Sequence, residues 1–288
     1  QFSPYTGELF DDNVTVLKPN KPEDLEALWY YAISGMLQND VKKLDKKRSV
    51  TAGTFTKVNV EFESLKSNAK SLLPAGLPQP YSNDPTQWIF HGHPAGSVIW
   101  CENDKRTVEG ELRTDDTVLQ VAVARLLGYQ WPAELDEDME LAPEQRAWVE
   151  RCKALAKHAD DDGIVCLAAV RGEAPAHQRI EALLESAYGN QWTTHTRDQL
   201  LKAVGSASIE QWLYNKFFEQ HCKLFQNRPF IWHIWDGLKD GFNVLVNYHK
   251  LDKAGLERLI YTYLGDWIRT QQEGVQTGVD GAEERLAA

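Results

Sequence analysis

The sequence lacks the short motifs that identify several large enzyme classes. It contains no GxGxxG or GxxxxGK[ST] segment, which excludes the usual dinucleotide-binding and P-loop phosphate cradles. It also contains no GxSxG nucleophile elbow and no HExxH helix. Asn-Pro-Pro-Tyr and Asp-Pro-Pro-Tyr are absent, and Asp84-Pro85-Thr86-Gln87 only begins in that way. We therefore expect no catalytic centre within this chain.

Cysteine and long apolar runs are also scarce. The four cysteines, Cys101, Cys152, Cys166 and Cys222, form no CxxC pair. This spacing argues against a zinc site and a disulfide framework, and it favours a reducing compartment. No apolar run approaches membrane-spanning length, and no basic-plus-apolar leader is visible. The sequence thus predicts a cytoplasmic protein with no membrane partner.

Positive charge is in deficit. The chain has 31 Lys and Arg against 42 Asp and Glu, a net charge of −11. Because attraction to phosphates dominates nucleic-acid binding, this balance excludes a general nucleic-acid binder. Any contact with DNA would need a local basic patch. The acidic residues are concentrated over residues 131–178, so the average conceals an asymmetry.

The two ends of the sequence point to a longer polypeptide. The chain starts at Gln1 without a methionine, and residues 283–288 look like the first turns of a helix. We expect the chain to be a fragment.

The pattern of residues 1–66 predicts a small strand–helix–strand unit. Residues 13–17 form an expected short strand, and Pro22 with the acids that follow it starts a helix that continues to about Leu44. Residues 54–62 alternate between apolar and polar and predict the closing strand. Residues 67–84 are rich in Pro, Ser and Asn and predict a linker, followed by a second domain over residues 85–288.

The second domain is predicted to be helical around one aromatic β-hairpin. Helical spacing or capping signals occur over residues 117–128, 143–155, 176–188, 197–204, 208–225 and 254–271. Two alternating aromatic runs within residues 228–249 are separated by the turn Asp236–Gly241, which is typical of a hairpin. Both hairpin faces are apolar, so we expect helices to cover both. The predicted class is α+β and predominantly helical.

One basic run is suited to nucleic acid. Lys42, Lys43, Lys46, Lys47 and Arg48 lie near the expected helix end, and Lys57 lies in the segment that follows. Such cations can each neutralise a phosphate. Lysines at a helix end also simply complement the helix dipole. The sequence alone leaves both interpretations open.

Three other groups of residues have a chemical and a structural interpretation. His91 and His93 could bind a metal with His233, His249 or Asp236, or could hydrogen-bond within a rigid loop. His221 and Cys222 are adjacent on a helix and point in different directions, which disfavours a Cys–His nucleophile. Residues 160–163 read Asp-Asp-Asp-Gly but lack the later carboxylates of a calcium loop, so a solvated turn is favoured. We expect no metal site.

Three segments carry a resemblance to a known family. They are residues 84–94, residues 120–129 and residues 212–249, the last including Arg228-Pro229-Phe230, the turn after Trp235, and Asn247-Tyr248-His249. These segments resemble large bacterial adenine-specific N6 DNA methyltransferases, of the type IIG-like kind and of the BREX and DISARM phage-defence systems. Residues 1–66 are similar to the end of a target-recognition domain like those of type I specificity subunits.

The resemblance implies a division of labour within a larger enzyme. S-adenosylmethionine would be bound by a catalytic domain of the same polypeptide, because the family's cofactor and catalytic motifs match no position here. This chain would bind no cofactor itself and would contact double-stranded DNA through residues 42–57. The family's signature would include Arg228, Trp232, Trp235, Asp236 and His249, which we expect to fix the hairpin in place.

A second hypothesis needs no DNA contact. An acidic, aromatic-rich helical body could instead be a protein–protein interaction module that docks other proteins of a defence complex. Salt-dependent DNA binding separates the two hypotheses.

Overall fold

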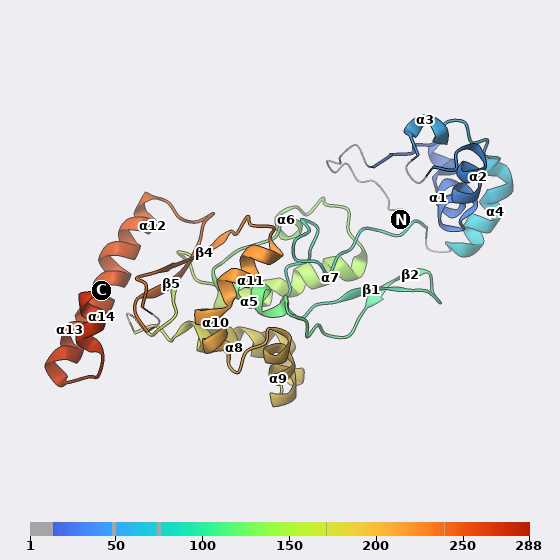
Figure 1. Ribbon diagram of the computed structural model, residues 1–288. Coiled ribbons are helices and arrows are strands. Elements are labelled where there is room, and N and C mark those ends of the chain that lie inside the picture. The colour runs from blue at the N-terminus through green and yellow to red at the C-terminus, as the bar shows by residue number, and fades with distance from the viewer. Residues whose placement is uncertain (1–13, 48–49, 74–75, 171, 239) are drawn as a thin grey trace. The chain divides into compact units, whose positions relative to one another are not determined.

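The computed structural model describes residues 14–47, 50–73, 76–170, 172–238 and 240–288. Helices dominate, and the strands form a two-stranded and a three-stranded sheet, which confirms the predicted α+β class (Figure 1). The chain divides into two compact units. Unit 1 comprises residues 1–80, 99–109 and 140–143, and unit 2 comprises residues 81–98, 110–139 and 144–288. No helix in the described ranges is long and apolar enough to cross a membrane.

The N-terminal part of unit 1 is helical. Its elements are the 3₁₀-helix η1 (Pro22–Asp24) and the α-helices α1 (Leu25–Ile33), α2 (Met36–Leu44), α3 (Ala52–Phe55) and α4 (Phe62–Leu72). The single helix expected from Pro22 to Leu44 is broken at Gly35, whose φ of 81° lies in the left-handed region. Only glycine adopts that conformation without steric cost, so the break is encoded locally.

The two strands predicted for this region are wrong. Residues 14–17 form no strand and pair with nothing that the structure describes, and Asn13 lies outside the described residues. The segment 54–62 is instead the end of α3, a loop, and the first residue of α4. Phe62, Leu65 and Ala69 share one helix face, and this helical spacing competes with the alternation of the preceding residues. A strand also needs a partner, and the described residues of unit 1 near this segment offer none.

A hairpin that the sequence pattern did not predict forms the smaller sheet. Strands β1 (Val98–Cys101) and β2 (Arg106–Glu109) are joined by a tight turn. Lys105 adopts a φ of 49° in that turn, and its Nζ lies 2.5 Å from Glu102 Oε2. The turn is polar throughout, which explains why the segment resembles a loop in the sequence.

Unit 2 is built around the helix α5 (Val118–Leu126), which is buried along its whole length. Seven of its nine residues are apolar and lie on all sides of the helix, as expected of a helix at the centre of a domain. Its neighbours in the chain are α6 (Pro132–Leu135), α7 (Pro143–Cys152), η2 (Lys153–His158), α8 (Ala176–Tyr188), η3 (Gly189–Gln191), α9 (Thr194–Ala203), α10 (Ile209–Asn215) and α11 (Phe217–Leu224). The helix predicted over 208–225 is therefore two helices, divided at Lys216.

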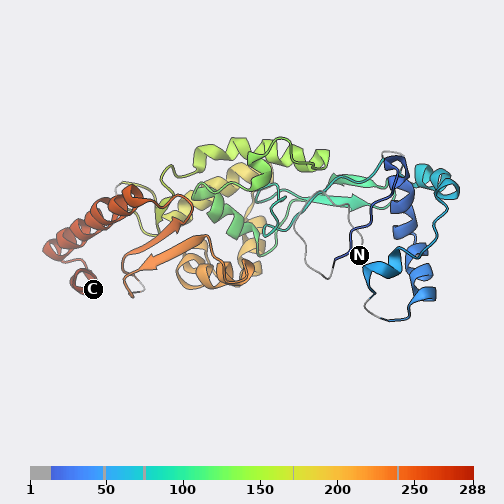
Figure 2. The same cartoon turned by 90° about the horizontal axis from the view of Figure 1, so that it is seen from above.

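The predicted aromatic hairpin is confirmed. Strands β4 (Ile231–Trp235) and β5 (Asn243–Asn247) pair antiparallel, with Trp232 opposite Val246 (Figure 2). The strand β3 (Ile164–Cys166) pairs with the other side of β5, so the order is β3-β5-β4 and β5 is central.

Each face of this sheet has its own apolar core. Val165, Leu245 and Ile231 point into the larger core, with α5, α8 and α10. Val244 and Val246 point into a second core, which contains Leu259, Tyr263 and Trp267 from the C-terminal helices. Those helices are α12 (Lys253–Arg258), the π-helix η4 (Leu259–Leu264), α13 (Gly265–Thr277) and α14 (Ala282–Ala287).

The expectation that both hairpin faces are covered is wrong for β4. All five residues of β5 are buried, but Trp232 and Trp235 are 46% and 55% exposed. These tryptophans are exposed because β4 is an edge strand and the C-terminal helices cover the sheet at β3 and β5.

Candidate functional sites

The lysines singled out in the sequence are displayed where α2 ends. Lys42 and Lys43 lie in its last turn, and Lys46 and Lys47 follow its end. Asp45 ends the helix with an extended conformation, and its Oδ1 accepts the backbone N–H of Lys47 at 2.9 Å. Lys57 follows α3, which contacts α2. All five side chains are exposed, and Arg48 lies outside the described residues.

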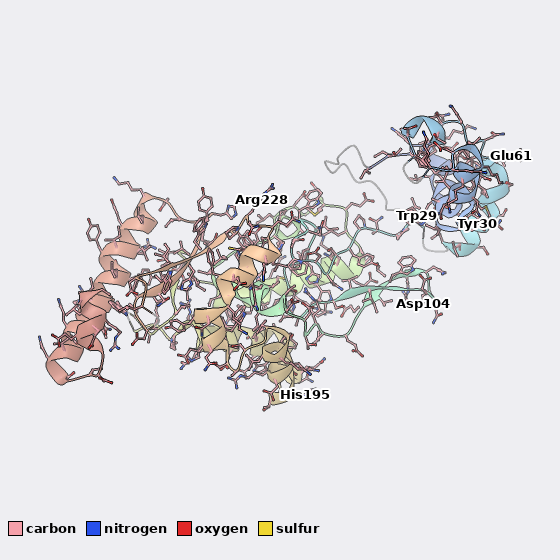
Figure 3. The ribbon with its side chains drawn as sticks, viewed as in Figure 1. Trp29, Tyr30, Glu61, Asp104, His195 and Arg228 are labelled. Carbon is pink, nitrogen blue, oxygen red and sulfur yellow. The ribbon has the colours of Figure 1, made fainter. Side chains whose placement is uncertain are left out.

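One of these lysines is already paired. Lys43 Nζ donates to Asp40 Oδ1 at 2.6 Å, and Tyr31 donates its hydroxyl to the other oxygen of Asp40 at 2.6 Å. The hydrogen bonds from Lys43 and then from Tyr31 lower the pKa of Asp40. Burial and the bond to Asp40 raise the pKa of Tyr31. Lys43 is thereby held on α2 against the N-terminal helix α1, on which Trp29 and Tyr30 also lie (Figure 3).

The other four lysines are free to take an anion. Lys42, Lys46, Lys47 and Lys57 have no carboxylate within 4 Å in the described part of the chain. We call these four the free lysines. The segment 36–57 carries six Lys and Arg against two Asp, whereas residues 81–288 carry 21 Lys and Arg against 32 Asp and Glu. A polyanion would therefore meet local positive charge in the N-terminal helices and a net negative charge in the rest.

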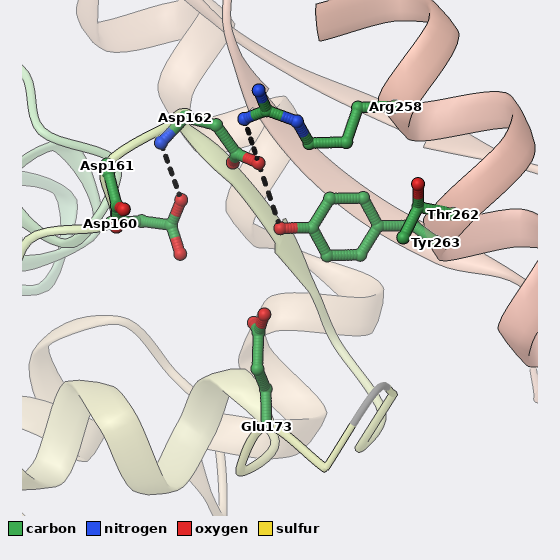
Figure 4. A pocket seen from close by; sticks show the side chains of 7 residues that line it. All are labelled: Asp160, Asp161, Asp162, Glu173, Arg258, Thr262 and Tyr263. Carbon is green, nitrogen blue, oxygen red and sulfur yellow. Dashed lines mark hydrogen bonds and ion pairs between the residues drawn. The ribbon is translucent and has the colours of Figure 1, made fainter.

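A polar pocket of about 300 Å³ lies where β3 begins, in unit 2 (Figure 4). Its lining combines four carboxylates with one guanidinium and two hydroxyls: Asp160, Asp161, Asp162, Glu173, Arg258, Thr262 and Tyr263. The π-helix η4 carries the two hydroxyl residues, and Arg258 precedes it.

Most of the charge in this pocket is internally paired. Asp162 Oδ2 accepts from Arg258 Nη1 at 2.8 Å and from the Tyr263 hydroxyl at 3.1 Å. Arg179 donates to Asp160 Oδ2 at 2.8 Å and to Glu173 Oε2 at 3.1 Å. The pocket thus fastens the C-terminal helices and α8 to the start of β3.

The two inner aspartates of the pocket differ in acidity. Burial, followed by the hydrogen bond with Asp162, raises the pKa of Asp160. Burial opposes ionisation of Asp162 as well, but hydrogen bonds with Asp160 and Arg258 lower its pKa. The segment is a helix-to-strand turn as the sequence favours, but Asp160 is buried rather than solvated. Within the described ranges, no group of three or more His, Cys, Asp or Glu is placed to hold a metal ion.

His91 and His93 are buried in a rigid polar part of the core. His91 Nδ1 accepts the backbone N–H of His93 at 3.0 Å, and the His93 ring lies 4.7 Å from the Trp148 ring. Cys152 Sγ donates to the His91 carbonyl at 3.2 Å. Burial lowers the pKa of both histidines, that of His93 to about 3. These contacts correspond to the structural interpretation of the His-Gly-His segment.

The metal partners considered for these histidines have other bonds. His233 Nε2 lies 2.8 Å from Asn243 Oδ1. Asp236 accepts the backbone N–H groups of Leu238 and Phe242 at 2.9 and 2.6 Å, which closes the hairpin turn. The His249 ring lies beside Tyr129, with centroids 5.9 Å apart. Arg228 is exposed in the loop before β4 (Figure 3).

A buried network that the sequence did not reveal links α5, α11 and β4. His221 Nε2 accepts the backbone N–H of Ile231 at 3.2 Å, and its Nδ1 lies 3.0 Å from Gln120 Oε1. Gln120 Nε2 donates to the Phe217 carbonyl at 3.3 Å. Gln120 and Arg125 are the two polar residues of α5, and the glutamine was the available signal, because a buried amide requires partners.

Comparison with known proteins adds no relative. No protein-family model matches the chain, and the search of curated proteins finds no match.

Proposed function

We propose that this chain is a non-catalytic DNA-recognition and scaffold part of an S-adenosylmethionine-dependent adenine-N6 DNA methyltransferase of a restriction or phage-defence system. The main support for a DNA contact is the group of free lysines, which are exposed and have no carboxylate partners among the described residues. The link to the methyltransferase rests on the resemblance of residues 84–94, 120–129 and 212–249.

The free lysines would bind the DNA backbone. Each lysine that neutralises a phosphate releases condensed counterions, and this release supplies affinity without sequence readout. In the intact enzyme the target adenine must leave the base stack, which costs a few kcal/mol. Backbone contacts made by this chain would help offset that cost while the catalytic domain of the same polypeptide transfers the methyl group.

The test is the salt dependence of DNA binding. Changing Lys42, Lys46, Lys47 and Lys57 to Ala should weaken binding to a duplex and reduce the log–log salt slope by about 3 to 4, since each phosphate contact contributes about 0.9. Fluorescence anisotropy of a labelled duplex at several salt concentrations measures both quantities.

A matched control removes the same charge elsewhere. Lys157, Lys202, Lys223 and Lys253 are exposed in unit 2 and should be replaceable by Ala with little change in the salt slope. An unchanged slope in the first variant, or an equal loss in both variants, would contradict a DNA contact at the free lysines.

The alternative of a protein-interaction module has one observation in its favour. Trp232 and Trp235 are exposed on an acidic unit, where large aromatic residues suit a protein partner. Absence of salt-dependent DNA binding by the whole chain would favour this second function.

A further inference from the structure

The outer edge of β4 presents backbone groups that no neighbouring strand uses. Asn247 N–H donates to Gly163 O at 2.9 Å, so the odd-numbered residues of β5 bond to β3. Tyr248 N–H donates to Phe230 O at 2.9 Å and Asp236 N–H to Phe242 O at 3.2 Å, so the even-numbered residues of β4 bond to β5. Because ladder bonds alternate in direction along an antiparallel strand, the odd-numbered residues of β4 point their N–H and C=O groups outward.

Only the start of this edge is closed. The outward N–H of Ile231 is bonded to His221 Nε2 on α11 at 3.2 Å. For the outward N–H and C=O groups of His233 and Trp235, the described chain offers no hydrogen-bond partner. The open half of β4 is therefore His233–Trp235.

Of the side chains from Trp232 to Trp235, all but that of His233 are apolar and exposed. Trp232 and Ile234 are 46% and 38% exposed on one face, and Trp235 is 55% exposed on the other. The Phe218 ring of α11 lies 6.3 Å from the Trp232 ring and 6.4 Å from the His233 ring, so it lies beside the strand edge where the open half begins. Exposed edge strands are normally protected by lysine, proline or a bulge, and residues 231–235 contain neither lysine nor proline and pair with β5 without a bulge.

We propose that the open half of β4 receives an extended, cationic segment of another protein as a fourth strand of this sheet. Two outward N–H and C=O pairs in register specify an extended chain rather than a helix or a flat surface. Trp232 and Trp235 would contact alternate side chains of the added strand on the two faces of the sheet.

The net charge around β4 favours a protein segment over a nucleic acid as the added strand. Residues 81–288 carry 32 Asp and Glu against 21 Lys and Arg, and Asp236 lies directly after the open half. This balance repels a polyanion and favours Lys and Arg on the incoming strand. The proposal does not depend on DNA binding by the free lysines, which lie in unit 1.

The test uses the whole chain and capped synthetic heptapeptides. A labelled peptide of alternating lysine and valine is titrated with the protein and followed by fluorescence anisotropy. The matched peptide of alternating glutamate and valine should bind at least tenfold more weakly. Equal or tighter binding of the glutamate peptide, or of an oligothymidine of similar length, would overturn the choice of partner.

Two substitutions at Trp235 separate backbone pairing from simple aromatic contact. Trp235→Pro removes the outward N–H but leaves the ladder to β5, which uses Ile234 and Asp236. It should weaken binding of the lysine peptide roughly tenfold, the loss expected when one such bond is removed and its partner is left unpaired. Trp235→Ala keeps the N–H and should cost about threefold, since part of one apolar contact is lost. Equal losses in both variants would contradict strand addition.

Trp232→Lys provides an independent test in case the Trp235→Pro variant does not fold correctly. It changes no backbone group and places a cation beside the cationic strand, so it should also weaken binding at least tenfold. Urea unfolding curves of each variant that match the curve of the wild type would show that its fold is intact. Unchanged binding in Trp232→Lys would overturn the proposal. A concentration-dependent dimer in sedimentation, abolished by Trp232→Lys, would show that a second copy occupies the edge instead.

Discussion

At the scale of single residues, buried neutral histidines hold unit 2 together. His221 donates a hydrogen bond from Nδ1 to Gln120 Oε1 and accepts one at Nε2 from the backbone N–H of Ile231. This pair of bonds requires the neutral ring with its proton on Nδ1. Burial lowers the pKa of His221 to about 3, as it does for His93. A protonated His221 would lose its bond from Ile231, so acid should act on the fold directly.

We expect the free energy of unfolding to decrease as the pH is lowered, because these histidines bind protons more weakly in the folded chain than in the unfolded chain. The unfolded chain takes up protons on histidine near pH 6.5, while the folded chain does not until about pH 3. Stability is therefore complete above about pH 6.5 and is lost as pH falls towards 3, by about 2 kcal/mol per histidine at pH 5. Urea unfolding at pH 7.5 and 5.0 measures the loss. His221→Gln should show a loss smaller by about 2 kcal/mol, and an identical loss would contradict the assignment.

Gly92 offers a second prediction at this scale. Its φ is +78°, and a Cβ added there would strike the carboxylate of Glu134, which forms a buried ion pair with Arg125. Gly92→Ala should lower the free energy of unfolding by roughly 3 kcal/mol or more, from backbone strain and overpacking together. Gly278 has a φ of +73° with nothing within 4 Å, so Gly278→Ala isolates the strain and should cost about 1 kcal/mol. Equal losses in chemical denaturation would argue against the steric clash.

At the scale of elements, the sheet is held between two apolar cores. Trp267 is buried on α13, and its ring meets that of Phe242 edge-on at 5.9 Å. Trp232, an equally large side chain, is exposed on β4. The two residues therefore provide a matched pair for measuring what the C-terminal helices contribute.

Trp267→Ala should cost about 3 to 4 kcal/mol because a buried aromatic leaves a cavity. Trp232→Ala should cost about 0.5 kcal/mol, the usual effect at an exposed site. Hydrogen exchange should show lost protection of β5 amides in Trp267→Ala alone. If both variants unfold at the same urea concentration, the C-terminal helices do not stabilise the sheet.

The elements also show what could be predicted from the sequence. The hairpin was predictable because two alternating runs flank a Gly/Asp turn, and both signals are local. The absence of strands from the described N-terminal residues was not predictable, because residues 54–62 do alternate but no described strand lies beside them. Register and burial depend on contacts between distant segments, so the exposure of β4 and the bond from Gln120 to α11 lay beyond local pattern. The lysines could be found in the sequence, but their freedom from carboxylates could not.

At the scale of the whole molecule, charge is unevenly divided. The first 80 residues carry 10 Lys and Arg against 10 Asp and Glu, and the remaining residues carry the entire net charge of −11. DNA that approaches the free lysines would therefore also experience the field of the acidic remainder. At low ionic strength that field reaches about 30 Å, but only about 8 Å at physiological salt.

We expect neutralised acidic residues to speed DNA association only at low salt. Glu137 and Asp138 are exposed in the acidic segment. Replacing them with Gln and Asn should raise the association rate a few-fold near 10 mM salt and leave it unchanged near 150 mM, because screening removes the long-range repulsion. Stopped-flow anisotropy measures these rates. A rate increase that persists at 150 mM would indicate a direct contact rather than a field effect.

The two asparagines of β5 have a consequence for how this molecule avoids misfolding. Asn243 and Asn247 are buried on the same face of the sheet, where Asn247 Nδ2 donates to Leu127 O at 3.1 Å. A slip of β5 by one residue would turn both amides towards Leu259, Tyr263 and Trp267, an apolar core. Two unpaired amides there would cost several kcal/mol. The asparagines therefore disfavour the misregistered sheet, and they help to specify the register of β5 during folding.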